Sequence, residues 1–149
     1  MFNSRYRRRQ RREVPTEILG PKKVKVGFPQ SEVDSDIINK AVWNHFGTSG
    51  GGWGGPIPER PFLANAMKDN KDKYRRAMKK SAKKILLGET SLDTVLRKLG
   101  ILAQGDIQNE ITNLTTPANS PVTIELKGSS NPLVDTGEMR GAVTWKTDD

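Results

Sequence analysis

Two long helical patterns, separated by a single glycine, constrain the fold of this chain most strongly. Residues 61–87 carry a narrow stripe of apolar side chains at helical spacing, with basic residues on the remaining faces. Gly88 is expected to end this helix. Thr90 and Asp93 have the spacing of a capping box, so we place the start of a second helix there and its end near Asn113. The apolar stripe of this second helix consists of Leu92, Val95, Leu96, Leu99, Leu102, Ile107, Ile111 and Leu114.

Strand-like patterns lie on both sides of the two helices. Apolar and polar residues alternate over 22–28, while 122–126 and 142–145 read as a short extended piece and a final strand. The segment 31–46 fits one helical face, with Val42 on it, although its last six residues also fit a strand. Together these patterns predict a single α+β domain over 22–149, in which a small, mainly antiparallel sheet packs with two long helices on one face. Because a small sheet has open edges, we expect partners to complete it.

Glycines mark two further features. Gly100 and Gly105 each weaken the second helix by about 1 kcal/mol relative to alanine, which indicates a kink or a closely packed neighbour. Five glycines surround Trp53 within residues 48–58 and predict a flexible loop. Trp53 either docks on a neighbouring subunit or folds back on its own domain. The loop lacks the Lys-Ser/Thr pair of a phosphate-binding loop.

Composition excludes several classes of function. The 149 residues suffice for one domain and include no cysteine, which excludes disulfides, thiolate catalysis and cysteine-based zinc sites and favours a reducing compartment. His45 is the only histidine, so a histidine-based metal site is not expected either. We expect no cofactor. No apolar run approaches the roughly 20 residues that span a bilayer, so we expect no membrane segment.

Positive charge is concentrated in two places. The formal net charge is +8, yet a basic arm over residues 1–21 and the basic helix over 68–84 hold more positive charge than this, so the remainder is acidic. The arm binds DNA phosphates, threads onto an acidic partner surface, or remains a solvated tail. The helix is either a solvated face or a second contact for a polyanion or an acidic partner. Candidate contact residues are Arg5, Arg7, Arg8, Arg9, Arg11 and Arg12 in the arm and Arg75, Arg76, Lys79 and Lys80 in the helix.

The tripeptide Asp135-Thr136-Gly137 matches the active-site sequence of retroviral-type aspartic proteases. Only 12 residues follow it, too few for the flap and remaining strands of such an enzyme. The alternative is a turn that leads into the last strand, since Asp and Gly are ordinary turn residues. His45 has no nucleophile in a suitable context and is more easily explained as structural. The sequence therefore predicts a protein that is not an enzyme.

Two segments resemble a family of neck and tail-completion proteins of tailed bacteriophages. Residues 43–48 and 57–63 (WNHFGT and IPERPFL) are similar to the family pattern N-E-F-G-T … I-P-x-R-P-F. Residues 127–140 (KGSSNPLVDTGEMR) are similar to K-G-S-x-x-P-L-x-D-T-G-x-(L/M)-R. The resemblance covers about 22–147. His45 replaces a glutamate that is usual in the family, and the basic arm inherits nothing from the resemblance.

The resemblance implies an α+β structural subunit without catalysis. Such subunits assemble as rings, commonly hexamers, between the head connector or adaptor and the tail terminator or tail tube, with packaged DNA in the lumen. The implied locations are the neck of the virion and, during assembly, the host cytoplasm. Within the motifs, Arg60, Pro61 and Phe62 are expected to fix the entry into the basic helix. The second motif supplies Asp135, Thr136, Gly137 and Arg140, with Asp135 capping a turn and Arg140 pairing with an acid.

Two classes of function therefore remain. The first is a ring-forming head–tail joining subunit of a phage neck. The second is a small basic DNA-binding protein, monomeric or dimeric. The two differ in oligomeric state and in the salt dependence of DNA binding, because phosphate contacts release counterions and weaken steeply as salt rises.

Overall fold

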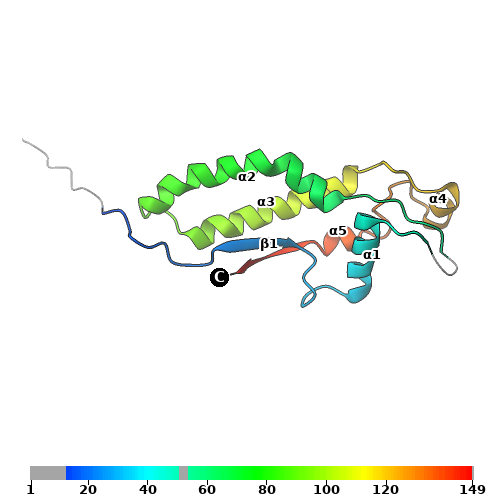
Figure 1. Ribbon diagram of the computed structural model, residues 1–149, viewed down its shortest axis with the longest axis horizontal. Coiled ribbons are helices and arrows are strands. Elements are labelled where there is room, and N and C mark those ends of the chain that lie inside the picture. Colours follow the sequence, from blue (N-terminus) through cyan, green and yellow to red (C-terminus); the bar gives the residue numbers. More distant parts are fainter. Residues whose placement is uncertain (1–12, 51–53, 149) are drawn as a thin grey trace, which may run out of the picture.

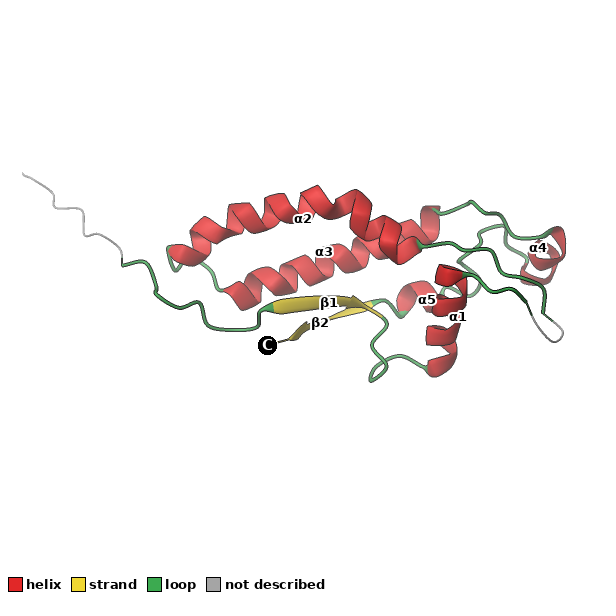
Figure 2. Ribbon diagram, in the orientation of Figure 1, coloured by secondary structure: helices red, strands yellow, loops and turns green. Residues whose placement is uncertain are grey.

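The computed structural model describes residues 13–50 and 54–148 and has a mixed α+β fold, as the sequence predicts. The two strands lie at opposite ends of the sequence but side by side in space, and the body is elongated (Figure 1). Figure 2 shows the same view with helices and strands distinguished. The elements in chain order are β1 (Lys23–Gly27), α1 (Ser35–Phe46), α2 (Phe62–Leu86), α3 (Leu92–Asn113), α4 (Pro121–Lys127), α5 (Glu138–Gly141) and β2 (Thr144–Asp148).

The central layer is α3, which lies between α2 on one side and the sheet on the other (Figures 1 and 2). Both long helices lie on the same side of the sheet, as predicted, but the contacts with the strands come mainly from α3, and α2 forms a further layer on it (Figure 1). Since α3 has the more continuous apolar surface, it can contact two layers at once, whereas the basic faces of α2 require solvent or a partner. Ile107 and Ile111 of α3 are 1% and 0% exposed and form the centre of the core with Phe62 and Val143.

The start of α3 differs by one residue from the predicted cap. Ser91, not Thr90, is the N-cap: its backbone is extended and its Oγ accepts a hydrogen bond from the Thr94 N–H at 3.1 Å. Asp93 does not reach back to a backbone N–H and instead pairs with Arg97 one turn later at 2.8 Å. Both serine and threonine are good caps, so the sequence alone did not separate these adjacent positions.

The sheet consists of β1 and β2 in antiparallel pairing, with Val24 opposite Thr147 and Val26 opposite Trp145. These four side chains share one face, because paired residues in an antiparallel sheet point to the same side. Trp145 from this face contacts Gly100 of α3. Within the described part of the chain no third strand joins this sheet, so each strand has one open edge.

For two shorter segments the structure shows one sequence prediction to be wrong and decides between the two alternatives left open for the other. The expected extended piece at 122–126 is wrong: this stretch is the helix α4, which begins at the N-cap Ser120 with proline in its first turn and ends at a left-handed Gly128. Val122 and Leu126 are exposed and Ile124 is only partly buried, so their alternation did not indicate a buried strand face. The ambiguous segment before the glycine loop is helical to its end as α1, with Asp34 as its N-cap.

The region around the glycine loop is held by one short antiparallel bridge between Thr48 and Ile57. The Thr48 N–H donates to the Ile57 carbonyl at 2.8 Å, and the Ile57 N–H donates back at 3.1 Å. This bridge brings the end of α1 close to the chain that enters α2. No helix within the described ranges 13–50 and 54–148 has the length and apolar character to cross a membrane.

Candidate functional site

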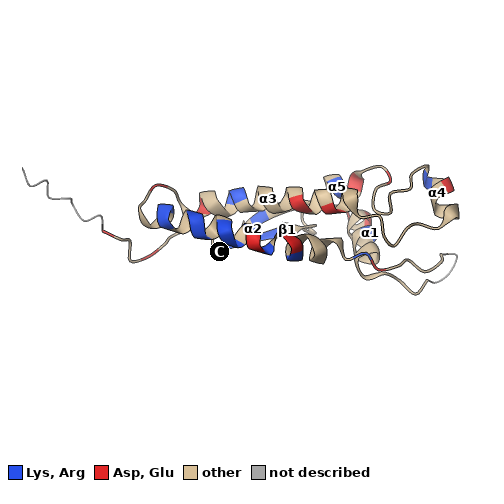
Figure 3. Ribbon diagram, turned by 90° about the horizontal axis from the view of Figure 1, so that it is seen from above, with Lys and Arg blue, Asp and Glu red and all other residues tan. Residues whose placement is uncertain are grey.

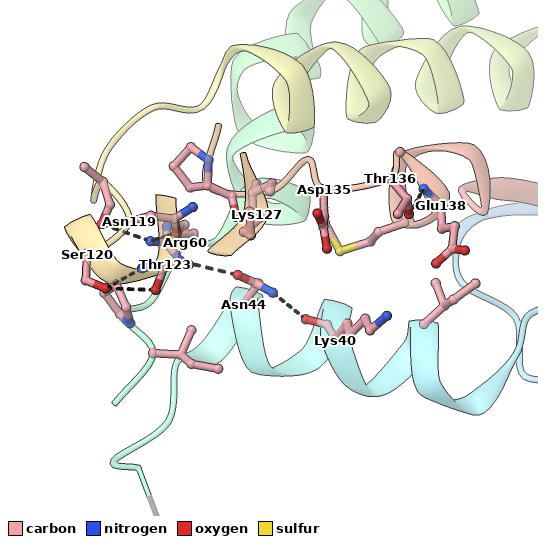
Figure 4. Close-up of a pocket in the computed structure, with 18 of the residues that line it drawn as sticks. Lys40, Asn44, Arg60, Asn119, Ser120, Thr123, Lys127, Asp135, Thr136 and Glu138 are labelled. Carbon is pink, nitrogen blue, oxygen red and sulfur yellow. Dashed lines mark hydrogen bonds between the residues drawn. The ribbon is translucent and has the colours of Figure 1, made fainter. Parts of the chain in front are cut away.

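The two motif segments, far apart in the sequence, meet at the end of the molecule that carries α1, α4 and α5 (Figures 1 and 4). Between them lies an open cavity of about 550 Å³. The first motif contributes Asn44, Ile57, Pro58 and Arg60 to its lining. The second motif contributes Lys127, Pro132, Leu133, Asp135, Thr136, Gly137, Glu138 and Met139.

Arg60 is the centre of this region and is 2% exposed. Its Nε donates to the Pro117 carbonyl at 2.7 Å, and one terminal nitrogen donates to the carbonyl of Ala118 and the side chain of Asn119, both at 3.2 Å. The other terminal nitrogen donates to Oδ1 of Asn44 at 3.3 Å (Figure 4). The guanidinium therefore joins α1 to the segment that precedes α4.

All four acceptors of the Arg60 side chain are neutral oxygens, so no carboxylate compensates its charge. Burial accordingly lowers the pKa of the guanidinium, although arginine remains protonated at any physiological pH. Arginine suits this position because its planar group presents five donors in fixed directions. The arrangement makes Arg60 a structural crosslink between separate segments of the chain.

The residues around Arg60 fix the entry into α2, as the motif predicts. The Arg60 N–H donates to the Asn44 carbonyl of α1 at 2.8 Å. On the other side, the Phe62 N–H at the start of α2 donates to the Arg60 carbonyl at 2.7 Å. Pro61, with φ −76°, directly precedes the helix. Phe62 is 0% exposed and packs edge-to-face on Phe28, with ring centroids 6.2 Å apart.

His45 lies in this packing rather than at a reactive site. Its ring meets Phe62 edge-to-face with centroids 5.5 Å apart, and its Nδ1 is buried without a hydrogen-bond partner. Burial lowers the His45 pKa, and the nearby charge of Glu59 opposes that shift. Because the unpaired ring nitrogen favours the neutral form, the geometry agrees with the structural interpretation of His45.

In the second motif, the turn is organised by Asn131, which sequence reasoning did not single out. Its Oδ1 accepts hydrogen bonds from the N–H groups of Leu133 at 3.0 Å and Val134 at 3.1 Å. Its Nδ2 donates to the Thr112 carbonyl at the end of α3, at 2.7 Å. The capping role expected of Asp135 thus belongs to Asn131. The asparagine-proline pair was the available signal, since it favours turn initiation.

Asp135, Thr136 and Gly137 form the turn that leads into α5, with Gly137 at φ 84°. The Thr136 hydroxyl accepts from the Glu138 N–H at 3.5 Å. Asp135 is exposed on the cavity wall, and its charge partly offsets the lowering of the Lys127 pKa, which arises mainly from burial (Figure 4). The Lys127 ammonium instead donates to the carbonyl of Asn131 at 3.3 Å.

Arg140 is exposed and makes no ion pair with any described residue, contrary to the pairing that the motif suggested. It contributes through its backbone, whose carbonyl accepts from the Gln108 side chain at 3.2 Å.

The basic face of α2 is exposed and lies over the half of the helix nearest the α2–α3 turn (Figure 3). Arg75 reaches Asp72 at 3.6 Å, a weak exposed pair. Arg76, Lys79 and Lys80 make no ion pair with a described residue. The candidate interface on α2 is therefore available for contact and carries uncompensated positive charge.

Other candidates lie outside the described residues. These are Trp53 and the arginines of the arm, namely Arg5, Arg7, Arg8, Arg9, Arg11 and Arg12. Among the described residues there is no group of three or more His, Cys, Asp or Glu side chains arranged to hold a metal ion.

Two exposed apolar clusters were not predicted from the sequence. On α1, Val42, Trp43 and Phe46 are 45%, 49% and 70% exposed. On α4, Val122 and Leu126 are 64% and 83% exposed. The sequence interpretation placed Val42 on the buried face of its helix, but Ala41 and Ile37 take that face, so Val42 points outward.

Comparison with known proteins adds no relative: no family model, no curated protein and no solved structure matches this chain.

Proposed function

We propose that this protein is a structural subunit of a tailed-bacteriophage virion, which forms a ring in the neck and joins the head connector to the tail. The proposal combines the motif resemblance with the distribution of exposed surface. In this role the chain has no substrate and binds no cofactor. Its activity is the formation of specific contacts with copies of itself and with the neighbouring rings.

The observation that carries the proposal is the amount of interaction surface on so small a body. Among the described residues the sheet has two strands, each with an open edge, and an isolated pair of strands is marginal unless other elements or partners cover it. On α1, Trp43 and Phe46 expose large apolar side chains. Aromatic residues of this kind are enriched in protein–protein interfaces.

The motif cluster supports the same role. Arg60, Asn44 and Asn131 of the two motif segments are used in internal hydrogen bonds that join separate parts of the chain. A motif whose residues hold the fold together is expected in a protein that acts through its shape. Asp135, the one residue with a catalytic precedent, lies exposed in a turn.

The mechanism is geometric. Each subunit contacts its neighbours through sheet edges and exposed helix faces, and a repeated head-to-tail contact closes a ring when its rotation divides a full turn. A ring that presents the basic face of α2 toward its lumen would attract packaged DNA without reading its sequence, because phosphate contacts carry no sequence information.

Incorporation into particles tests this proposal. The reading frame is disrupted in the phage genome that encodes it, and the lysate is imaged and then complemented with purified protein. We expect separate heads and tails that complementation joins. A matched pair of variants, Trp43→Ser/Phe46→Ser against Ile101→Ser/Leu86→Ser, asks whether the exposed α1 cluster is required, since all four residues are exposed. Joined, infectious particles in the absence of the protein would exclude the proposed role.

The second candidate function, a basic DNA-binding protein, is favoured by the uncompensated charge of α2. It predicts that the isolated chain binds duplex DNA and that affinity falls steeply with salt, with a slope set by the number of phosphates contacted. A neck subunit outside its assembly is expected to show little affinity of this kind.

A further inference from the structure

A groove between α2 and α3, next to the turn that joins them, has a pattern that the proposed function does not use. Its volume is about 470 Å³. Apolar side chains form the floor, including Met78, Leu99 and Leu102, and three lysines stand at the rim: Lys80, Lys84 and Lys98. One acid, Glu89, also lines it. The three lysines make no ion pair or hydrogen bond with a described residue.

A segment with the opposite character precedes the first strand. Residues 13–19 contain two acids, Glu13 and Glu17, and three apolar side chains, and contain no base. Every residue from 13 to 20 is exposed, and Val14, Ile18 and Leu19 are 63%, 42% and 77% exposed. An exposed acidic and apolar strand complements an apolar groove with a lysine rim both in charge and in polarity.

The groove and the end of the segment 13–19 also match in length. The groove extends from Ala77 to Lys84 along α2, a rise of about 10 Å at 1.5 Å per residue. Three extended residues span about the same distance. Glu17, Ile18 and Leu19 therefore fit the groove, with the carboxylate at the rim.

Within its own chain this segment does not occupy the groove. Gly20 lies beside Asp93, with a hypothetical Cβ 4.0 Å from the Asp93 side chain, so the segment starts at the beginning of α3. From there it runs away from the helix pair rather than back along it (Figure 1). A neighbouring copy of the chain can receive it without a reversal of direction.

We infer that residues 13–19 of one copy dock in the lysine-rimmed groove between α2 and α3 of the next copy. Ile18 contacts the apolar floor. Glu17 and Leu19 point the other way in an extended chain and lie at the rim, where Glu17 meets Lys80 and Lys84. Such a contact joins two different surfaces, so its repetition generates a ring or an open chain of subunits. The inference deepens the proposed function, on which it rests, by naming a subunit contact and assigning the arm to it.

Engineered cysteines test this contact directly, because the natural chain has none. One chain carries Leu19→Cys and a second carries Lys98→Cys, and the two are mixed at equal concentration under mild oxidation. We expect a disulfide-linked heterodimer in several-fold excess over the yield from Leu19→Cys mixed with Lys79→Cys, since Lys79 does not line the groove. Equal yields from both mixtures would overturn the inference.

A chain that carries both Leu19→Cys and Lys98→Cys distinguishes docking between copies from docking within one chain. Linkage between copies gives dimers and larger species on a non-reducing gel. A fast-migrating monomer alone would show that the segment binds its own groove and would also overturn the inference.

Charge exchange provides an independent measurement. Glu17→Lys in the arm chain, or Lys80→Glu with Lys84→Glu in the groove chain, should each lower the heterodimer yield by about threefold. Combining the two should restore it. The control Lys71→Glu with Lys83→Glu makes the same charge change on α2 outside the groove and should leave the yield unchanged. Failure of the combined variant to restore linkage would contradict the charge pairing.

The outcomes separate this inference from the proposed function. If the protein joins heads to tails but shows no specific linkage through residue 19, the arm contact is wrong and the neck role stands. If linkage is specific but particles assemble without the protein, the arm contact stands and the neck role is wrong.

Discussion

Gly100 of α3 lies directly against the indole ring of Trp145 in β2: a Cβ built on this glycine would be 2.6 Å from Cδ2 of the ring. This close approach allows the sheet to pack onto α3. The other glycine in the same helix, Gly105, has no heavy atom within 4 Å of its hypothetical Cβ. The sequence predicted a kink or a closely packed neighbour at both glycines, but only Gly100 has such a neighbour.

Gly100→Ala should lower the free energy of unfolding by about 1–3 kcal/mol, because the added methyl group must displace an indole within the packed layer. Gly105→Ala is the matched control. It should raise stability by up to about 1 kcal/mol, since alanine favours the helix and meets open space. Urea denaturation monitored by circular dichroism measures the free energy of unfolding of both variants. Equal changes in the two would show that Trp145 does not pack as described.

Arg60→Ala should destabilise the protein by about 3 kcal/mol, because several hydrogen bonds are lost inside a site where Arg60 is 2% exposed. Arg60→Lys should recover only part of this, since one ammonium cannot reach acceptors on both sides of the cluster. Arg140→Ala, at an exposed position of the same motif set, should change stability by no more than about 0.5 kcal/mol. Thermal or denaturant unfolding of the three variants checks the ranking, which an equal loss in Arg60→Ala and Arg140→Ala would contradict.

Stability should fall as the pH drops through the range in which His45 titrates. The folded-state pKa of His45 is lowered by burial, so the unfolded chain binds the proton more readily, and unfolding becomes favoured below the unfolded pKa of about 6.5. One proton gives a slope of at most about 1.4 kcal/mol per pH unit. His45→Phe removes this group. Unfolding free energies at pH 7.5 and 5.5 should differ less in the variant than in the natural chain, and an identical difference would contradict the lowered pKa.

The contact between the two long helices rests partly on Asp106. Its carboxylate accepts from the Lys73 ammonium at 2.6 Å and from the Tyr74 hydroxyl at 2.8 Å, and burial together with this carboxylate raises the Tyr74 pKa. Asp106→Ala should destabilise by about 2–3 kcal/mol, because the side chain is only 10% exposed and its partners lose their acceptor.

Asp72→Ala provides the control for that change. Asp72 is 78% exposed and pairs with Arg75 at 3.6 Å. Asp72→Ala should therefore change the free energy of unfolding by no more than about 0.5 kcal/mol. Comparing the denaturation midpoints of the two aspartate variants separates a buried link between helices from a surface pair. Similar midpoints would indicate that Asp106 is solvated.

The sequence predicted the elements whose periodicity extends over several turns. The ranges of α2 and α3 and the position of β1 follow from apolar spacing, and Gly88 ends the first long helix region with φ 70° as expected. Periodicity failed over short stretches. The residues 122–126 formed α4 because Ser120 and Pro121 begin a helix, and no buried surface opposed it.

The sequence patterns did not predict the order of the layers or the hydrogen bonds of the Arg60 cluster. Nothing in the amphipathic pattern of α2 says that it packs mainly on α3, since an apolar stripe fits either a helix or a sheet. The Arg60 cluster depends on contacts such as that with the Pro117 carbonyl, 57 residues away. The resemblance drew attention to the motif residues, but it did not reveal which oxygens they bind. Asn131 was missed because its two roles depend on the position of α3.

In the proposed role, this chain acts by assembling into a ring. The most direct measurement is the mass of the full chain by light-scattering chromatography, alone and after mixing with head connectors from the disrupted phage particle, beside a version that lacks residues 1–21. We predict a species of one defined mass that corresponds to a closed ring, either alone or on the connector, and its loss without the arm. A stable monomer that ignores connectors and instead binds duplex DNA with steep salt dependence would contradict the claim.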